Sequence, residues 1–215
     1  MPTTLDATAL KSSESIQEHL NGVTDEMMLA LPAPVSLTSE ERRSVIARYS
    51  SVLEGNFIYW MTGAYLASRT TESRDIITEN LLEEVRECHP GMMRRFAVAA
   101  HAVPGEADAE IVYANLSRVR EFVGRLSAPS LLTMMAFFEG FIQRFMPYLA
   151  ECAREQGSNE REYTDVHSVC DIGHSQELFR ALDAELSVAA PGEDEDLLEG
   201  VQLLQALIRD IVAAA

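Results

Sequence analysis

The pattern His167-x-x-x-Asp171-x-x-His174 is the clearest candidate for chemistry in this sequence. In an α-helix, at about 100° per residue, the three side chains fall within an arc of about 60° and point toward one place. Two imidazoles and a carboxylate on one helical face are suitable ligands for a first-row transition metal. The alternative is a solvated polar face, but the chain has only five histidines and two of them fall in this register. We therefore predict a metal site on this helix.

Glu139 is the one charged residue in the otherwise apolar stretch 131–142. Removing a carboxylate from water costs on the order of several kcal/mol unless it is paired or bound to a metal. No rotation of a helix could expose Glu139 without also exposing phenylalanine or methionine beside it. A functional carboxylate is therefore expected here, and the alternative is a carboxylate paired with a buried arginine such as Arg144.

Three further residues could complete such a site. Glu54 shares a helical face with apolar residues and directly precedes the uncharged segment 55–68, although it could also be a partly exposed carboxylate at the last polar turn. Glu79 and His89 lie ten residues apart, and the proline after His89 places that histidine at a helix end. Glu79 could instead belong to a solvated acidic face with the glutamates that follow it.

Together these positions provide three histidines and four carboxylates on four predicted helices: Glu54, Glu79, His89, Glu139, His167, Asp171 and His174. Four carboxylates neutralise two divalent cations, so a buried dinuclear iron or manganese centre would carry about zero net charge. The ferritin-type arrangement requires two Glu-x-x-His motifs. The sequence contains none, so a dinuclear site here would belong to another scaffold.

The elements that must position these residues are helices. Segments of helical periodicity are separated by proline and glycine, and the alternation typical of strands is missing. This pattern predicts an all-α, single-domain bundle of seven to eight helices, including one continuous helix from about residue 38 to 68. Residues 36–215 would form the bundle, joined by an N-terminal arm and helix in residues 1–35. The apolar last helix, in residues 195–214, would pack on the core or form a homodimer.

The overall charge excludes several partners. Seventeen basic residues face 34 acidic ones, and Lys11 is the single lysine, so nucleic acid and anionic membranes are not expected partners. No run of 18 apolar residues could span a membrane, and the N-terminus lacks the features of a signal peptide. Three widely spaced cysteines do not indicate a disulfide framework. These features predict a cytoplasmic protein.

Apolar residues beside the candidate ligands predict a pocket for a small molecule. The expected lining is Phe57, Met61, Tyr65, Met135 and Phe138. Because the chain has one lysine, a substrate carboxylate would be held mainly by arginine, whose guanidinium binds carboxylates in a fixed orientation.

With this pattern of candidate ligands, the chain resembles the haem-oxygenase-like dimetal (di-iron) oxidase family. The resemblance covers roughly residues 40–187, and segment 79–96 is similar to the second core helix of that family. The matching positions are Glu54, then Glu79 and His89 ten apart, then Glu139, and finally His167, Asp171 and His174.

The resemblance implies a specific activity. Members form a bundle of about seven helices that binds two Fe(II) ions, or a mixed Mn/Fe pair, without haem. They use O2 to oxidise a small amino acid or carboxylic acid by desaturation, N-oxygenation or oxidative C–C cleavage, mostly in specialised-metabolite biosynthesis. The expected partner is thus a small-molecule substrate.

Other classes of function compete with this one. A metal-free hydrolase of the thiaminase II type shares the bundle topology but needs an activated cysteine, and neither Cys88 nor Cys170 has activating neighbours in the sequence. A cofactorless oxidase would not need all four carboxylates. A haem protein would need an early proximal histidine, for which His19 is the one candidate. A non-enzymatic acidic interaction protein would leave Glu139 and the histidine-rich face unexplained.

Overall fold

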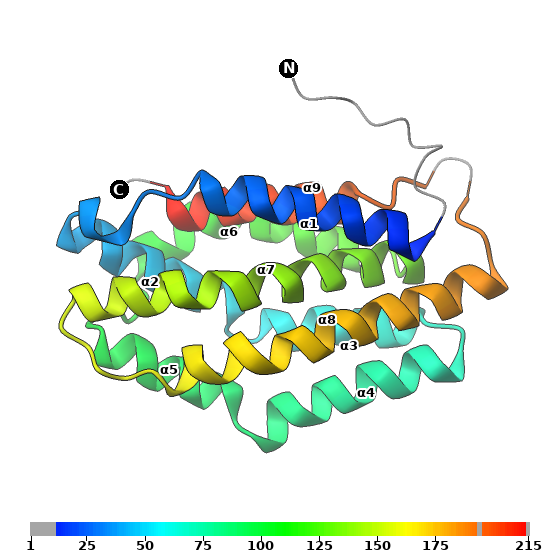
Figure 1. The fold of residues 1–215 in the computed structure, drawn as a ribbon, viewed down its shortest axis with the longest axis horizontal. Helices are drawn as coiled ribbons and strands as arrows, with labels where there is room; N and C mark the ends of the chain where they lie inside the picture. Colours follow the sequence, from blue (N-terminus) through cyan, green and yellow to red (C-terminus); the bar gives the residue numbers. More distant parts are fainter. Residues whose placement is uncertain (1–11, 193–194, 214–215) are drawn as a thin grey trace.

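The structure is a computed structural model that describes residues 12–192 and 195–213. In this part of the chain the secondary structure is entirely helical, which confirms the predicted all-α bundle (Figure 1). None of the described helices is long and apolar enough to cross a membrane. The α-helices are α1 (Ser13–Leu29), α2 (Ser39–Leu53), α3 (Asn56–Ala67), α4 (Thr71–Arg86), α5 (His89–Ala99), α6 (Glu106–Val123), α7 (Ala128–Glu155), α8 (Glu162–Val188) and α9 (Glu199–Val212), and a 3-10 turn, η2, spans Pro34–Ser36.

The helix starts follow from capping residues. The hydroxyl of Thr38 accepts a hydrogen bond from the backbone N–H of Glu41, and the Glu41 carboxylate accepts one from the backbone N–H of Thr38. This reciprocal pair satisfies two backbone groups that the first turn of α2 would otherwise leave without partners. The Thr70 hydroxyl likewise accepts a hydrogen bond from the backbone N–H of Ser73 and caps α4, without the reciprocal bond seen at Thr38.

The helix expected over residues 38–68 is divided into α2 and α3. Gly55 lies between them with φ +80°, in the left-handed region that glycine adopts at little cost. The side-chain amide of Asn56 donates a hydrogen bond to the backbone carbonyl of Val52 at 2.8 Å, which fixes the geometry of the break. The signal for this break was the Gly-Asn pair that follows Glu54.

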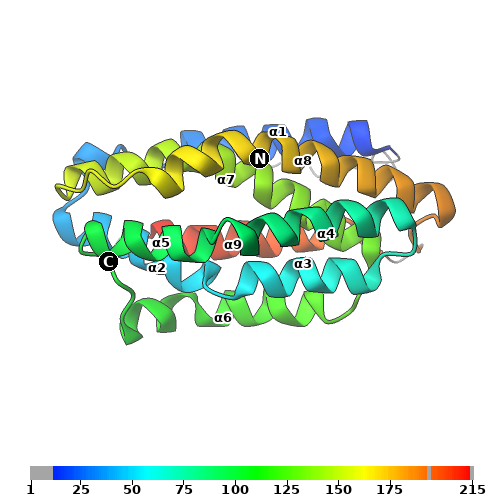
Figure 2. The ribbon, with the colours of Figure 1, turned by 90° about the horizontal axis from the view of Figure 1, so that it is seen from below.

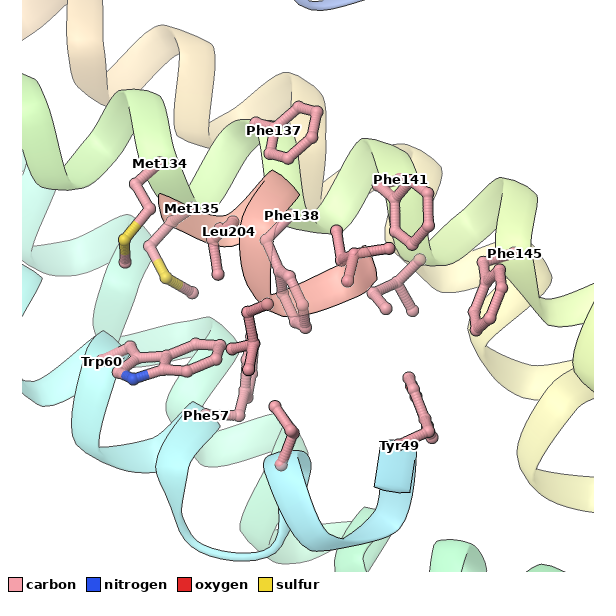
Figure 3. Packing of buried hydrophobic residues seen from close by; sticks show 14 of the residues in the cluster. Tyr49, Phe57, Trp60, Met134, Met135, Phe137, Phe138, Phe141, Phe145 and Leu204 are labelled. Carbon is pink, nitrogen blue, oxygen red and sulfur yellow. The ribbon is translucent and has the colours of Figure 1, made fainter. Parts of the chain in front are cut away.

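The core is organised around α7, whose most extensive contact is with α8. On α7, Met135 and Phe138 point toward α3 (Figure 3). The ring of Phe138 lies edge-to-face with Trp60 at 5.3 Å between centroids, and Phe141 stacks on Phe145 at 5.1 Å. Ile16 of α1 is buried in the same cluster.

Helices α4 and α5 follow one another end to end beside α8, and α2 and α3 do so in the neighbouring row (Figure 2). Each row thus contains a break: at residues 54–55 between α2 and α3, and at residues 87–88 between α4 and α5. Cys88 has φ 60° and so turns the chain sharply into α5. These two breaks border the site described below.

The apolar face of α9 packs against α6 and α7 within the same chain. The fully buried guanidinium of Arg48 donates hydrogen bonds to the carbonyls of Ala213, at 2.7 Å, and Asp210, at 3.3 Å. This cation satisfies carbonyl groups at the negative end of the α9 dipole.

Gly200 allows α9 to approach its neighbours closely, and we expect Gly200→Ala to destabilise the protein. A Cβ there would lie 2.6 Å from a ring atom of Phe122 and 2.9 Å from the Cβ of Met134. Overpacking costs about 1–3 kcal/mol, whereas alanine gains about 1 kcal/mol in helix propensity. Gly22→Ala in α1, where nothing lies within 4 Å of the added atom, is the control and should raise the melting temperature slightly. Equal melting temperatures for the two variants would contradict the packing argument.

Glu185 on α8 accepts hydrogen bonds from residues at the start of α4. We expect Glu185→Gln to lower the free energy of unfolding. Its carboxylate accepts hydrogen bonds of 2.9 Å from the backbone N–H groups of Arg69 and Thr70 and from the Thr70 hydroxyl. Burial raises the pKa of Glu185, but these hydrogen bonds outweigh burial and hold the pKa below its ordinary value.

A carboxyl whose pKa is lower in the folded state stabilises the protein above its unfolded-state pKa, and that contribution disappears as pH falls through the folded-state value. Chemical denaturation of wild type and Glu185→Gln at several pH values measures it. We expect a difference of about 1–3 kcal/mol at pH 7, shrinking in acid; a difference that grew in acid would contradict the assignment.

Candidate metal centre

A cluster of metal-binding side chains lies where α4, α5 and α8 meet. Glu84 is near the end of α4, His89 begins α5 and His167 lies in the first part of α8; one ligand atom from each lies within 4.8 Å of the other two. His89 Nδ1 is 2.7 Å from Glu84 Oε1, and His167 Nε2 is 3.9 Å from the same oxygen. Both histidines are buried, and the Glu84 side chain is 12% exposed.

The break between α4 and α5 places His89 in this cluster. After α4 ends, the left-handed conformation of Cys88 redirects the chain, and the next residue is His89 in the first turn of α5. The sequence suggested that His89, Pro90 and Gly91 stop the preceding helix, but α4 already ends at Arg86 and these three residues form the first turn of α5, where proline is tolerated.

The orientation of His167 is fixed by its own helix. Its Nδ1 lies 2.8 Å from the backbone carbonyl oxygen of Tyr163. Because a carbonyl can only accept a hydrogen bond, Nδ1 carries the proton and Nε2, on the side of Glu84, has the lone pair. Imidazoles that bind metals commonly donate their other N–H to a carbonyl or carboxylate in this way. Burial also lowers the pKa of His167, which favours the neutral form that a metal requires.

His89 is in a different electrostatic environment. Burial lowers its pKa, but the hydrogen bond and negative charge of Glu84, together with Glu87, outweigh burial and raise the pKa above its ordinary value. In the metal-free chain a proton is therefore held between His89 and Glu84. A metal cation would replace that proton, since histidine and carboxylate ligands bind metals in their deprotonated forms.

A second group of potential ligands adjoins the first. His174 Nε2 is 3.1 Å from Glu83 Oε2, and His174 Nδ1 is 3.9 Å from Glu139 Oε2. Glu139 is buried and lines the same cavity as Glu84, His89 and His167, so it lies between the two groups. Arg144, the arginine considered as its partner, instead lies 2.6 Å from Asp25 in a solvent-exposed ion pair.

The structure brings together four of the residues that the sequence indicated: His89, Glu139, His167 and His174. It does not bring Glu54 or Glu79 to them. Glu54 is the C-cap of α2, where its side chain is 58% exposed and 3.9 Å from Arg94, and Glu79 is exposed on α4. The side chain of Asp171 lies outside the described residues.

Glu83 and Glu84 are the positions that sequence reasoning missed, because they were assigned to a solvated acidic face. The signal for them is the buried stripe of α4, which contains Ile76, Ile77 and Asn80. Glu83 and Glu84 lie one turn beyond Asn80 on this stripe and so face the core.

A cavity of about 40 Å³ adjoins the cluster. This is enough room for a few water molecules. Of the predicted pocket residues, Phe57 and Phe138 line it, whereas Met61 and Met135 are packed in the core and Tyr65 is exposed. The described lining is Tyr49, Leu53, Gly55, Phe57, Ile58, Glu84, His89, Pro90, Met93, Phe138, Glu139, Ile142, Tyr163 and His167.

Comparison with known families agrees with this geometry. Residues 46–208 match a family described as iron-containing redox enzymes, and this range covers more than half of the chain and every residue of the cluster. The protein therefore belongs to this family, whose fold is haem-oxygenase-like, and the predicted resemblance is confirmed at that level. A comparison with curated proteins finds no match.

Proposed function

We propose that the protein is a non-haem di-iron oxidoreductase that uses O2 to oxidise a small molecule. The observation that carries this proposal is the buried Glu84/His89/His167 cluster, in which the Tyr163 carbonyl orients the Nε2 atom of His167 toward Glu84. Membership of an iron-containing redox family supports iron as the metal.

The donor set fits two ferrous ions. Carboxylates and neutral imidazoles are suitable ligands for Fe(II). Glu84, His89 and His167 would hold one ion, and Glu83, Glu139 and His174 the other, with Asp171 as a further ligand expected from the sequence. Within the described residues, Glu83 and Glu84 form ion pairs with histidines rather than with arginine or lysine. Bound cations would therefore neutralise carboxylates that are costly to bury.

Bound iron would supply the redox chemistry that activates O2. The chain's own contributions are positioning and shielding. The Tyr163 carbonyl fixes the ring of His167, and the apolar walls formed by Phe57 and Phe138 exclude water from reactive species.

The proposed substrate is a small amino acid or carboxylic acid, oxidised by desaturation, N-oxygenation or C–C cleavage. The apolar walls favour a partly aliphatic molecule. Among the described residues, the lining includes no arginine or lysine, so the charge that complements a substrate carboxylate here would be that of the metal ions rather than of arginine.

The test is anaerobic loading with Fe(II), removal of free metal and a count of iron per chain, followed by O2 uptake with a panel of amino acids and carboxylic acids. We expect close to two ions per chain and substrate-dependent O2 uptake. Absence of bound iron would refute the proposal, as would hydrolytic activity that survives complete chelation, which would indicate the thiaminase II type of function.

A further inference from the structure

We propose that the hydrogen-bonded pair Tyr49 and Tyr163 is redox-active and donates electrons and protons to the metal centre when O2 reacts without substrate. The inference rests on the proposed function. Both phenols line the cavity of the cluster, and neither is required as a metal ligand.

The geometry places Tyr163 against a proposed iron ligand. The ring centroids of Tyr163 and His167 are 4.3 Å apart, and the backbone carbonyl of Tyr163 accepts the His167 hydrogen bond. The two phenol oxygens of Tyr163 and Tyr49 are 2.7 Å apart, one hydroxyl donating to the other. The side chains come from α8 and α2, so the pair connects the cluster to a second part of the core.

Both tyrosines are shielded from solvent, at 1% exposed for Tyr49 and 3% for Tyr163. A charged phenol radical cation or a phenolate would be costly there. Loss of an electron together with the hydroxyl proton avoids that cost, because a neutral phenol becomes a neutral phenoxyl radical. Burial also separates such a radical from solutes that would quench it.

The hydrogen bond provides a route for the radical to move from Tyr163 to Tyr49. The O–H bond of Tyr49 breaks as an O–H bond on Tyr163 forms, and one electron accompanies the proton across the 2.7 Å contact. The oxidising equivalent can thus move away from the histidine ligands.

The two tyrosines can complete the reduction of O2 when no substrate is present. Reduction of O2 to two water molecules consumes four electrons and four protons. In the proposed di-iron protein, two of these electrons would come from bound Fe(II) and the other two would normally come from substrate. Without substrate, Tyr163 and Tyr49 can each give one electron and one proton, and solvent gives the two remaining protons.

The test uses the full chain loaded anaerobically with Fe(II), mixed with O2 without substrate and frozen at successive times for electron paramagnetic resonance. We expect an organic radical signal that narrows when the protein contains ring-deuterated tyrosine, which identifies a tyrosine without any mutation. The signal should be lost in Tyr163→Phe and decay faster in Tyr49→Phe. Tyr113→Phe, at an exposed position on α6, is the matched control and should match wild type.

Two results would overturn the inference: wild-type protein whose iron is oxidised without any tyrosyl signal, or a signal that persists in the Tyr49→Phe/Tyr163→Phe double variant. Iron content and the optical change on iron oxidation are recorded in the same samples. Absence of bound iron would remove the proposed function and this inference together, whereas iron that binds and is oxidised without a radical would remove this inference alone.

Discussion

Replacing His167 with alanine should remove iron from the Glu84/His89/His167 cluster and abolish O2-dependent turnover. The variant lacks one of three converging ligands and leaves Glu84 and His89 to hold the ion alone. The loss in affinity should exceed the roughly 10- to 100-fold that follows from removing a supporting hydrogen-bond partner of a ligand. Iron per chain after anaerobic loading and desalting measures the effect.

His19→Ala is the control for this experiment, because His19 lies on α1, which contributes no residue to the cluster. It should bind as much iron as wild type. Circular dichroism on both variants establishes that they are folded. A folded His167→Ala protein with the full wild-type complement of iron would contradict the proposed site.

Glu84→Gln should remove most of the iron that the cluster binds, whereas Glu79→Gln should leave the amount of bound iron almost unchanged. The two residues are of the same type on the same helix, but Glu84 is 2.7 Å from His89 and Glu79 is exposed. Glutamine keeps the size of the side chain and removes the charge that an Fe(II) ion needs. Fe(II) titrations of the two variants under identical conditions measure the difference.

The comparison of Glu84 with Glu79 also separates two interpretations of the ligand set. The ten-residue spacing before His89 favours Glu79, and the structure favours Glu84. Loss of iron in Glu79→Gln with retention in Glu84→Gln would support the spacing and overturn the assignment made from the structure.

The sequence predicted best those features that depend on one helix at a time. His167 and His174 share a face of α8 because their spacing alone determines that they do, and Glu139 is buried because its neighbours in α7 are apolar. The starts of α2 and α4 follow from Thr38 and Thr70. Each of these inferences uses only local periodicity or capping chemistry.

What the sequence could not provide is the rotation of one helix relative to another. Glu54 was placed by extending the periodicity of α2 through Gly55, but the left-handed glycine ends that periodicity and leaves Glu54 at the surface. Similarly, Glu79, Glu83 and Glu84 all lie on α4, and only the packing of α4 against α5 and α8 decides which of them meets a histidine.

The positions of the two chain breaks have a consequence for how this enzyme can change. The proposed ligands Glu139, His167 and His174 stand on α7 and α8, which share the most extensive helix contact, while Gly55 and Pro90 at the breaks form part of the cavity wall. Substitutions at residues 54–55 and at Pro90 can therefore reshape the cavity while the α7–α8 pair stays intact, whereas an insertion or deletion at residues 87–88 would displace His89 from Glu84. Glu83, Glu84 and His89 are the proposed ligands that stand beside the second break. A directed-evolution library of substitutions at these breaks, with Glu83, Glu84 and His89 held constant, would explore new substrates without dismantling the metal centre.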